Sequence, residues 1–133
     1  MLKILAVDDL HDHAETLVLL CEALGHVARV AFDGGEAVEI AGQFDPDVVF
    51  LDLDMPVLDG IKAARAIREI RCARRRVLVA LTGRTEFRFR HSAEVAGFDA
   101  YMTKPVDIDS LVEFIDRTDR DRRLQITATM PSL

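Results

Sequence analysis

Three aspartates and one lysine in this chain follow apolar runs, at positions where a parallel sheet would gather them. Asp8 and Asp9 directly follow one such run, Asp52 ends a second, and Lys104 closes the last strand-like segment. In open α/β sheets, ligands bind at the carboxyl ends of the strands, where the strand order reverses. Carboxylates held close together repel one another, and a divalent cation that prefers hard oxygen ligands neutralises them. The pattern predicts a magnesium site with a lysine beside it.

Short β-branched runs alternate with helical patterns along the chain. The runs predict strands at 2–7, 26–31, 47–52, 76–82 and 98–102. The helical patterns lie near 12–24, 34–43, 58–70, 86–96 and 107–117. Because the strands are continuously apolar, they suit a parallel sheet covered on both faces by helices. The expected fold is therefore α/β, with five βα units.

Length and charge limit the organisation and the location. The 133 residues predict one folded domain over 1–117 and a charge-rich tail over 118–133 that extends the last helix or is disordered. A net charge of -6 argues against a general affinity for nucleic acid or for anionic membranes. The sequence has no apolar run of about 18 residues and no secretion leader. We therefore expect a cytoplasmic protein.

Two cysteines and two histidines are further candidates for metal binding. Cys21 and Cys72 lack metal-ligand spacing, and Cys21 shares a helical apolar stripe, which predicts a buried reduced thiol. His11 and His13 flank the acidic pair and are candidate transition-metal ligands. The alternative is that both histidines are solvated at the start of a helix.

Five ordered motifs match the receiver domain of two-component response regulators. They are Val7-Asp8-Asp9, residues 51–56 with Asp59-Gly60, residues 80–83, residues 96–99, and Lys104-Pro105-Val106. The chain resembles this family from residue 2 to about residue 117, and the later motifs look most like receivers of hybrid histidine kinases. The resemblance implies a doubly wound, flavodoxin-like fold with strand order 2-1-3-4-5.

The resemblance also assigns chemical roles. Asp52 would be the phosphoacceptor, whose carboxylate attacks the phosphoryl group of a phosphohistidine and forms an acyl phosphate. Positioning and charge neutralisation dominate the catalysis of such transfers. Mg²⁺, or alternatively Mn²⁺, would be held by Asp8, Asp9, Asp52 and the backbone carbonyl of Asp54. The domain would then be a signalling phosphoacceptor that catalyses its own phosphorylation and dephosphorylation.

A switch and two classes of partner follow from the same resemblance. Lys104, before an implied cis proline, would contact the phosphoryl oxygens, Thr82 would donate its hydroxyl to them, and Tyr101 would change rotamer. The phosphodonor would be a histidine kinase or a histidine phosphotransfer protein. A downstream protein, or a second copy in a homodimer, would bind the fourth helix, fifth strand and fifth helix. Phe89 and Phe114 are expected as exposed anchors on that face.

Each assignment has a structural alternative. Asp8 and Asp9 precede a predicted helix and could serve only to cap it. Thr82 could simply end a strand, Tyr101 could be an edge aromatic, and Lys104-Pro105 could be an ordinary turn. The coincidence of these residues with the acidic set favours the functional interpretation.

Two other functions compete with the receiver. Asp52-Leu53-Asp54 is a D-x-D sequence, the nucleophile motif of haloacid-dehalogenase-like phosphatases, but such enzymes have a longer chain, a cap and a later acidic pair. An interaction module that has lost the phosphorylation switch is the second alternative. The complete set of aspartates with Thr82 and Lys104 argues against it.

Overall fold

The structure, a computed structural model, describes residues 1–53, 60–72, 75–83 and 97–129. Its strands are β1 (Lys3–Val7), β2 (Val27–Ala31), β3 (Val48–Asp52), β4 (Val77–Thr82) and β5 (Ala100–Thr103). Its helices are α1 (His11–Ala23), α2 (Gly34–Phe44), α3 (Gly60–Glu69) and α5 (Ile108–Thr129). The helix expected at 86–96 lies outside the described residues. Residues 118–129 continue the last helix without a break.

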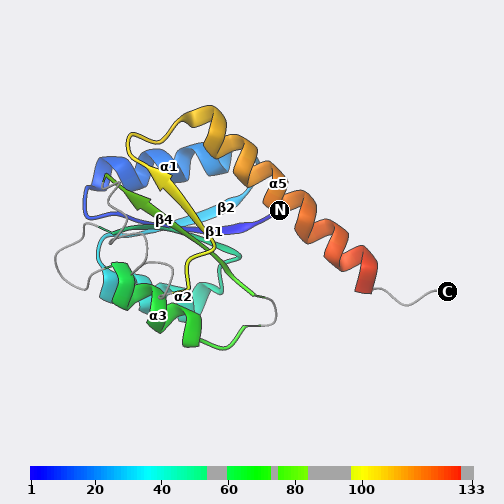
Figure 1. Cartoon of the computed structure of the whole chain (residues 1–133), viewed down its shortest axis with the longest axis horizontal. Helices are drawn as coiled ribbons and strands as arrows, with labels where there is room; N and C mark the ends of the chain where they lie inside the picture. The colour runs from blue at the N-terminus through cyan, green and yellow to red at the C-terminus, as the bar shows by residue number, and fades with distance from the viewer. Residues whose placement is uncertain (54–59, 73–74, 84–96, 130–133) are drawn as a thin grey trace.

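All strands are parallel and lie in the order β2-β1-β3-β4-β5. Helices α1 and α5 cover one face of the sheet, and α2 and α3 cover the other (Figure 1). This confirms the doubly wound α/β fold. The register places Val7 beside Leu51 and Asp52 beside Leu81, so the strands end at a common edge.

The core explains why β3 can carry a charged residue at its end. Every residue of β3 is buried. Val49 and Leu51 pack in the cluster beneath α2 and α3, whereas Val48 and Phe50 pack in the cluster beneath α1 and α5. Alternating side chains thus fill both faces, as in a central parallel strand. The strand is fixed on both sides up to Asp52.

Two side chains of the second cluster test the sequence predictions. Cys21 is a fully buried free cysteine, as predicted, and burial raises the pKa of its thiol to about 12.

The expectation that Phe114 is an exposed anchor is wrong. Its ring is half-buried and meets the ring of Phe50 edge-on, with 6.1 Å between the centroids. Phe114 lies three residues after Leu111, so it borders the apolar face of α5. Phe89 lies outside the described residues.

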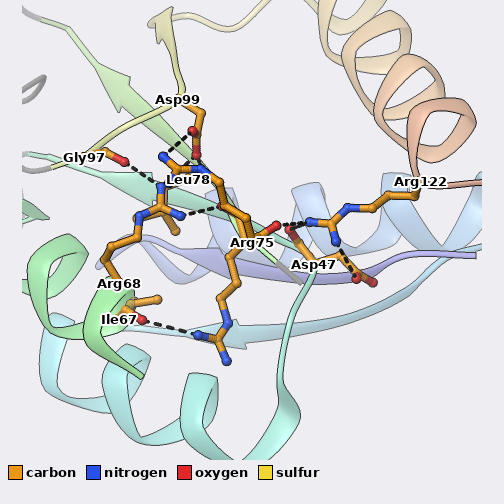
Figure 2. A network of polar contacts seen from close by, with 9 residues as sticks. Asp47, Ile67, Arg68, Arg75, Leu78, Gly97, Asp99 and Arg122 are labelled. Atoms are coloured by element: carbon orange, nitrogen blue, oxygen red, sulfur yellow. Dashed lines mark hydrogen bonds and ion pairs between the residues drawn. The ribbon is translucent and has the colours of Figure 1, made fainter. Parts of the chain in front are cut away.

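Arginine side chains tie elements together at the edge of the sheet opposite the carboxyl ends. Arg68 donates a hydrogen bond to the carbonyl of Gly97 at 2.6 Å and another to the carboxylate of Asp99 at 2.8 Å (Figure 2). Asp99 also accepts from the N–H of Leu78 and from Arg75. Burial acts to raise the pKa of Asp99, but these hydrogen bonds outweigh it and lower the pKa. The start of β5 is thereby fixed to α3 and β4.

Two further arginines are buried at the same edge. Arg76, only 3% exposed, donates to the carbonyls of Ile67 and Ile70 at the end of α3 and pairs with Asp45 at 2.7 Å. Arg122 of α5 donates to the carbonyls of Asp47 and Arg75 (Figure 2). Guanidinium groups can satisfy several carbonyl oxygens at once. The two arginines therefore connect α3 and α5 to the first residues of β3 and β4.

Gly60 provides a test of the packing that supports Asp52. A Cβ atom at Gly60 would lie 2.5 Å from Cδ2 of Leu53 and 2.9 Å from the carbonyl oxygen of Asp52. We therefore expect Gly60→Ala to lower the free energy of unfolding by about 1–3 kcal/mol, a typical cost of overpacking. Urea unfolding measures this value.

Gly42 is the matched control, because it also lies in a helix. A Cβ atom at Gly42 would meet no described atom within 4 Å beyond the backbone of its own helix. Gly42→Ala is expected to raise the free energy of unfolding by about 0.5–1 kcal/mol. Equal effects of the two substitutions would contradict the close approach at Gly60.

Candidate functional site

The carboxyl ends of β1 and β3 bring three acidic side chains together. Asp8, Asp9 and Asp52 each present a carboxylate oxygen, and these oxygens lie within 4.8 Å of one another. Asp8 and Asp52 are buried, whereas Asp9 is exposed. The predicted acidic cluster is therefore present, with an accessible side. Asp54, whose carbonyl was expected to join it, lies outside the described residues.

Lys104 reaches the cluster from the end of β5. Its Nζ lies 2.9 Å from Oδ1 of Asp52 and 3.7 Å from Oδ2 of Asp8. The peptide bond between Lys104 and Pro105 is cis, as the resemblance implied. One ammonium group thus offsets part of the repulsion among three carboxylates.

The surroundings of Asp8 distinguish a charged site from a helix cap. Its Oδ1 accepts a hydrogen bond from the N–H of Leu10 at 3.0 Å, and Nδ1 of His13 lies 3.6 Å from its Oδ2. The residue at the N-cap of α1 is Leu10, which forms no side-chain capping bond. Burial raises the pKa of Asp8, and the nearby charge of Asp52 raises it further. Asp8 therefore occupies a setting that disfavours its negative charge, and it does not serve as the N-cap of α1.

Thr82 and Tyr101 lie on the two strands that follow β3 in the sheet. Thr82 is the last residue of β4 and is buried, and its carbonyl accepts a hydrogen bond from the N–H of Lys104 at 2.9 Å. Tyr101 is half-buried on β5, with its ring centroid 6.3 Å from that of Phe98. The structure thus ties Thr82 directly to Lys104.

The two histidines near the acidic pair differ in their contacts, and only His13 lies beside a carboxylate of the cluster. The ring of His11 stacks on Phe32 with 3.7 Å between the centroids, and the side chain of His13 is 59% exposed. Among the described residues, the cluster that could hold a metal ion contains the three aspartates and neither histidine. The structure therefore gives no support to a histidine-ligated transition metal.

An apolar groove of about 420 Å³ adjoins the site and was not predicted from the sequence. Leu17 and Leu20 of α1 and Leu111 of α5 line it, and Asp8 and Lys104 lie among its polar members. Leu17 and Leu20 have the spacing of core residues. Only the structure shows that a space remains between helices α1 and α5. No sequence signal could have revealed this groove.

Comparison with known proteins identifies the family to which this chain belongs. The family model described as response regulator receiver domain matches residues 4–116. The chain belongs to the response regulator receiver family. Chemotaxis protein CheY of Halobacterium salinarum is 34% identical over 113 residues, which are 85% of this chain and 92% of that protein. Protein PilH of Pseudomonas aeruginosa is 32% identical over 116 residues, which are 87% of this chain and 96% of that protein.

A solved structure adds a metal-bound example. The receiver domain of sensor histidine kinase PA1611 from Pseudomonas aeruginosa, with magnesium coordinated in its active-site cleft, is 30% identical, with a TM-score of 0.78. The match covers 87% of this chain and 95% of that one. Receivers of kinases and receivers with little else in their chain thus match at similar identity, so the comparisons do not single out hybrid kinases.

Membership in this family makes the chain a phosphoacceptor domain of two-component signalling. Within the described residues, no helix combines the length and the apolar character that a membrane crossing requires. The acidic cluster is consistent with a divalent cation site.

Asp8 gives the site a measurable pH dependence. Because burial raises its pKa in the folded state, the protein loses stability as the pH rises from 3.8, the ordinary value, through the raised value. At neutral pH without divalent cations, Asp8→Asn should therefore be more stable than the wild type. The advantage should vanish below pH 3.8, where the carboxyl group is protonated in both states. Thermal unfolding in chelator across this range measures both curves, and a constant difference would contradict the assignment.

Proposed function

We propose that Asp52 receives a phosphoryl group from a phosphohistidine of a histidine kinase or a histidine phosphotransfer protein. The observation that supports this is the placement of the Asp52 carboxylate, which is buried, 2.9 Å from the ammonium of Lys104 and beside two further carboxylates. A cationic lysine and a carboxylate cluster able to hold a cation, both beside the Asp52 carboxylate, suit a transferring phosphoryl group.

The proposed phosphoryl transfer to Asp52 is a displacement at phosphorus. A carboxylate oxygen of Asp52 forms a bond to phosphorus, while the bond from phosphorus to the donor imidazole nitrogen breaks and that nitrogen keeps the electron pair. The product is an acyl phosphate, which water then hydrolyses to release inorganic phosphate and restore the carboxylate. Both steps take place on the domain itself, so it catalyses its own phosphorylation and dephosphorylation.

The residues present fit a hard divalent cation, with Mg²⁺ as the first choice and Mn²⁺ as the alternative. All donors in the cluster are carboxylate oxygens, the ligands that Mg²⁺ prefers. Asp8, Asp9 and Asp52 would hold the cation together with the backbone carbonyl of Asp54. When bound, it neutralises charge on the phosphoryl oxygens.

Lys104 and Thr82 would carry the signal away from Asp52. In the structure Lys104 pairs with Asp52, and a new phosphoryl group offers that ammonium a more highly charged partner. Because the N–H of Lys104 donates to the carbonyl of Thr82, movement of one strand end affects the other. Thr82 would then donate its hydroxyl to the phosphoryl group, and Tyr101 would change rotamer.

The proposed output is binding of a downstream protein at the face formed by the fourth helix, β5 and α5. The acidic net charge of -6 favours protein partners over nucleic acid or membrane lipids, which fits a cytoplasmic location. The D-x-D phosphatase alternative gains no support, because the family model that matches residues 4–116 is that of the receiver domain.

Magnesium should stabilise the fold. A cation that binds only the folded cluster adds about 2.7 kcal/mol to the free energy of unfolding at about 100 times its Kd. Asp9→Ala should abolish the rise in Tm, because it removes one of the three carboxylates that would hold the cation. Thermal unfolding with and without millimolar Mg²⁺ measures it, and an unchanged wild-type Tm would remove the cation site from the proposal.

Phosphorylation should depend on one side chain. With radiolabelled acetyl phosphate or a phosphorylated kinase, the wild type should acquire alkali-labile label that requires Mg²⁺, and Asp52→Ala should acquire none. Lys104→Ala should still bind Mg²⁺ but lose most of the conformational response, read by the fluorescence of Tyr101. Alkali-stable label, or label on a serine, would contradict an acyl phosphate on Asp52.

A further inference from the structure

The outer edge of β2 is open in the described part of the chain. Among the described strands, β2 pairs only with β1. The N–H of Val27 donates to the carbonyl of Leu2, so the backbone groups of Val27 face β1. Because successive residues of a strand direct these groups to opposite sides, the N–H and C=O groups of Ala28 and Val30 point away from the sheet. Each of these two residues offers one donor and one acceptor to a further strand.

A groove of about 540 Å³ adjoins this edge. It is lined by the edge strand and by the neighbouring side of α1, through Glu15, Val18, Leu19, Ala28, Arg29 and Val30. Leu19 is 66% exposed, and Val27 at the start of β2 is 42% exposed. Exposed apolar side chains beside unpaired backbone groups are the features of an edge that accepts a strand from another chain.

The two helices that pack against β2 are acidic. They are α1 and α2, and neither contains a lysine or an arginine. Their carboxylates belong to five residues that form no ion pair with another described residue, namely Asp12, Glu15, Glu22, Glu36 and Glu39. At 3.6 residues per turn, the three on α1 lie with Leu19 in an arc of about 80°, on the side of the helix that lines the groove. The charge beside the edge therefore suits a basic partner.

The positively charged residue of the groove, Arg29, directs its charge to the other face of the sheet. Its guanidinium carbon lies 4.8 Å from the centroid of the Phe44 ring, at the end of α2. Helices α1 and α2 cover opposite faces of the sheet (Figure 1). The carboxylates of α1 are thus left without this cation as a partner, and the α1 side of the groove is negative.

We propose that the β2 edge binds an extended, basic segment of a partner protein by strand addition. The backbone of the segment bonds Ala28 and Val30, and its cationic side chains contact the carboxylates of α1. The other edge strand, β5, belongs to the expected output face, and the acidic cluster lies at the carboxyl ends of β1 and β3. The proposed site shares no residue with either, and it does not depend on phosphoryl transfer to Asp52.

The alternation of side chains sets the sequence that the segment needs. Ala28 packs beneath α1 and α5, whereas Ala31 packs beneath α2 and α3, so Val27 shares the face of Ala31. On an added strand, every second side chain then faces α1, where lysine or arginine contacts Glu15 and its aliphatic stem covers Leu19. The intervening side chains face the exposed Val27 and are apolar. The partner segment thus alternates basic and apolar residues.

The probe is a fluorescent peptide of about seven residues that alternates lysine and valine, long enough to cover the five residues of β2. Fluorescence anisotropy at low salt measures its affinity. The same peptide with glutamate in place of lysine should bind at least about tenfold more weakly, because it meets like charges on α1. Binding of the lysine peptide should also weaken as salt is added, since exposed charges are screened.

Variants of the protein separate the charge from the backbone contacts. Glu15→Lys combined with Glu22→Lys should lower the affinity about tenfold. The matched double variant, Glu69→Lys with Glu113→Lys, makes the same charge change at exposed positions of α3 and α5 and should bind like the wild type. Ala28→Pro leaves the charges in place but removes an outward N–H, which edge strands tolerate, and it should also lower the affinity about tenfold.

Hydrogen exchange reports the backbone contacts directly. The lysine peptide should slow amide exchange at Ala28 and Val30 about tenfold or more, while Val27, whose N–H already bonds Leu2, should change little. This measurement uses the wild type, so it stands even where a variant folds poorly. Asp52→Ala should bind the peptide like the wild type, so loss of the phosphoacceptor and loss of this site give different results.

Failure of the wild type to bind the lysine peptide would overturn the proposal. Equal binding of the glutamate peptide, or unchanged exchange at Ala28 and Val30 in the presence of the lysine peptide, would overturn it as well. Self-association of the wild type that Ala28→Pro abolishes would assign the edge to a second copy instead of a basic partner.

Discussion

Repulsion among the carboxylates at the ends of β1 and β3 is the constraint on which the rest of this molecule depends. Asp8 and Asp52 are buried side by side, and burial together with the neighbouring charge makes ionisation of Asp8 unfavourable. One lysine compensates for only part of that charge. Interactions elsewhere in the fold must therefore offset the remaining repulsion. A further positive charge at this edge of the sheet would also be favourable. The same imbalance that costs stability is what makes the site receptive to a cation.

The opposite edge of the sheet shows where compensating stability resides. Asp47 exchanges backbone and side-chain hydrogen bonds with Lys3, accepts from Val77, and also contacts Arg122. Arg76 satisfies two carbonyls at the end of α3, as a helix C-terminus requires. The starts of the strands are thus held by hydrogen bonds and ion pairs between elements, while the ends of β1 and β3 carry carboxylates that repel one another. Polar contacts thus stabilise the edge where the strands begin, and the acidic cluster lies at the edge where they end.

Sequence reasoning succeeded where the signal was local or repeated. Apolar runs located the strands to within about two residues, as such patterns can, and the acidic and lysine motifs identified the family and the cluster. Sequence reasoning failed for side chains whose hydrogen-bond partners lie far away in the sequence. Arg76 and Arg122 look like solvated charges in sequence, but they bind backbone carbonyls of other elements, for which no pattern exists. Phe114 was misplaced because it borders the apolar stripe of α5, and a position on the border is decided by the neighbouring helix and Phe50 rather than by periodicity.

The complete burial of β3 has a consequence for the motions of the domain. Amide groups exchange with solvent through local opening, and segments with the most buried contacts open least often. Asp52 ends the strand that is buried at every position, whereas α5 runs beyond the sheet at its far end. Hydrogen exchange should accordingly be slowest along β3 and fastest in the last turns of α5. Asp52, the proposed phosphoacceptor, would then stay in place while the last turns of α5 open, so slow opening of β3 would accompany a rapidly reversible modification.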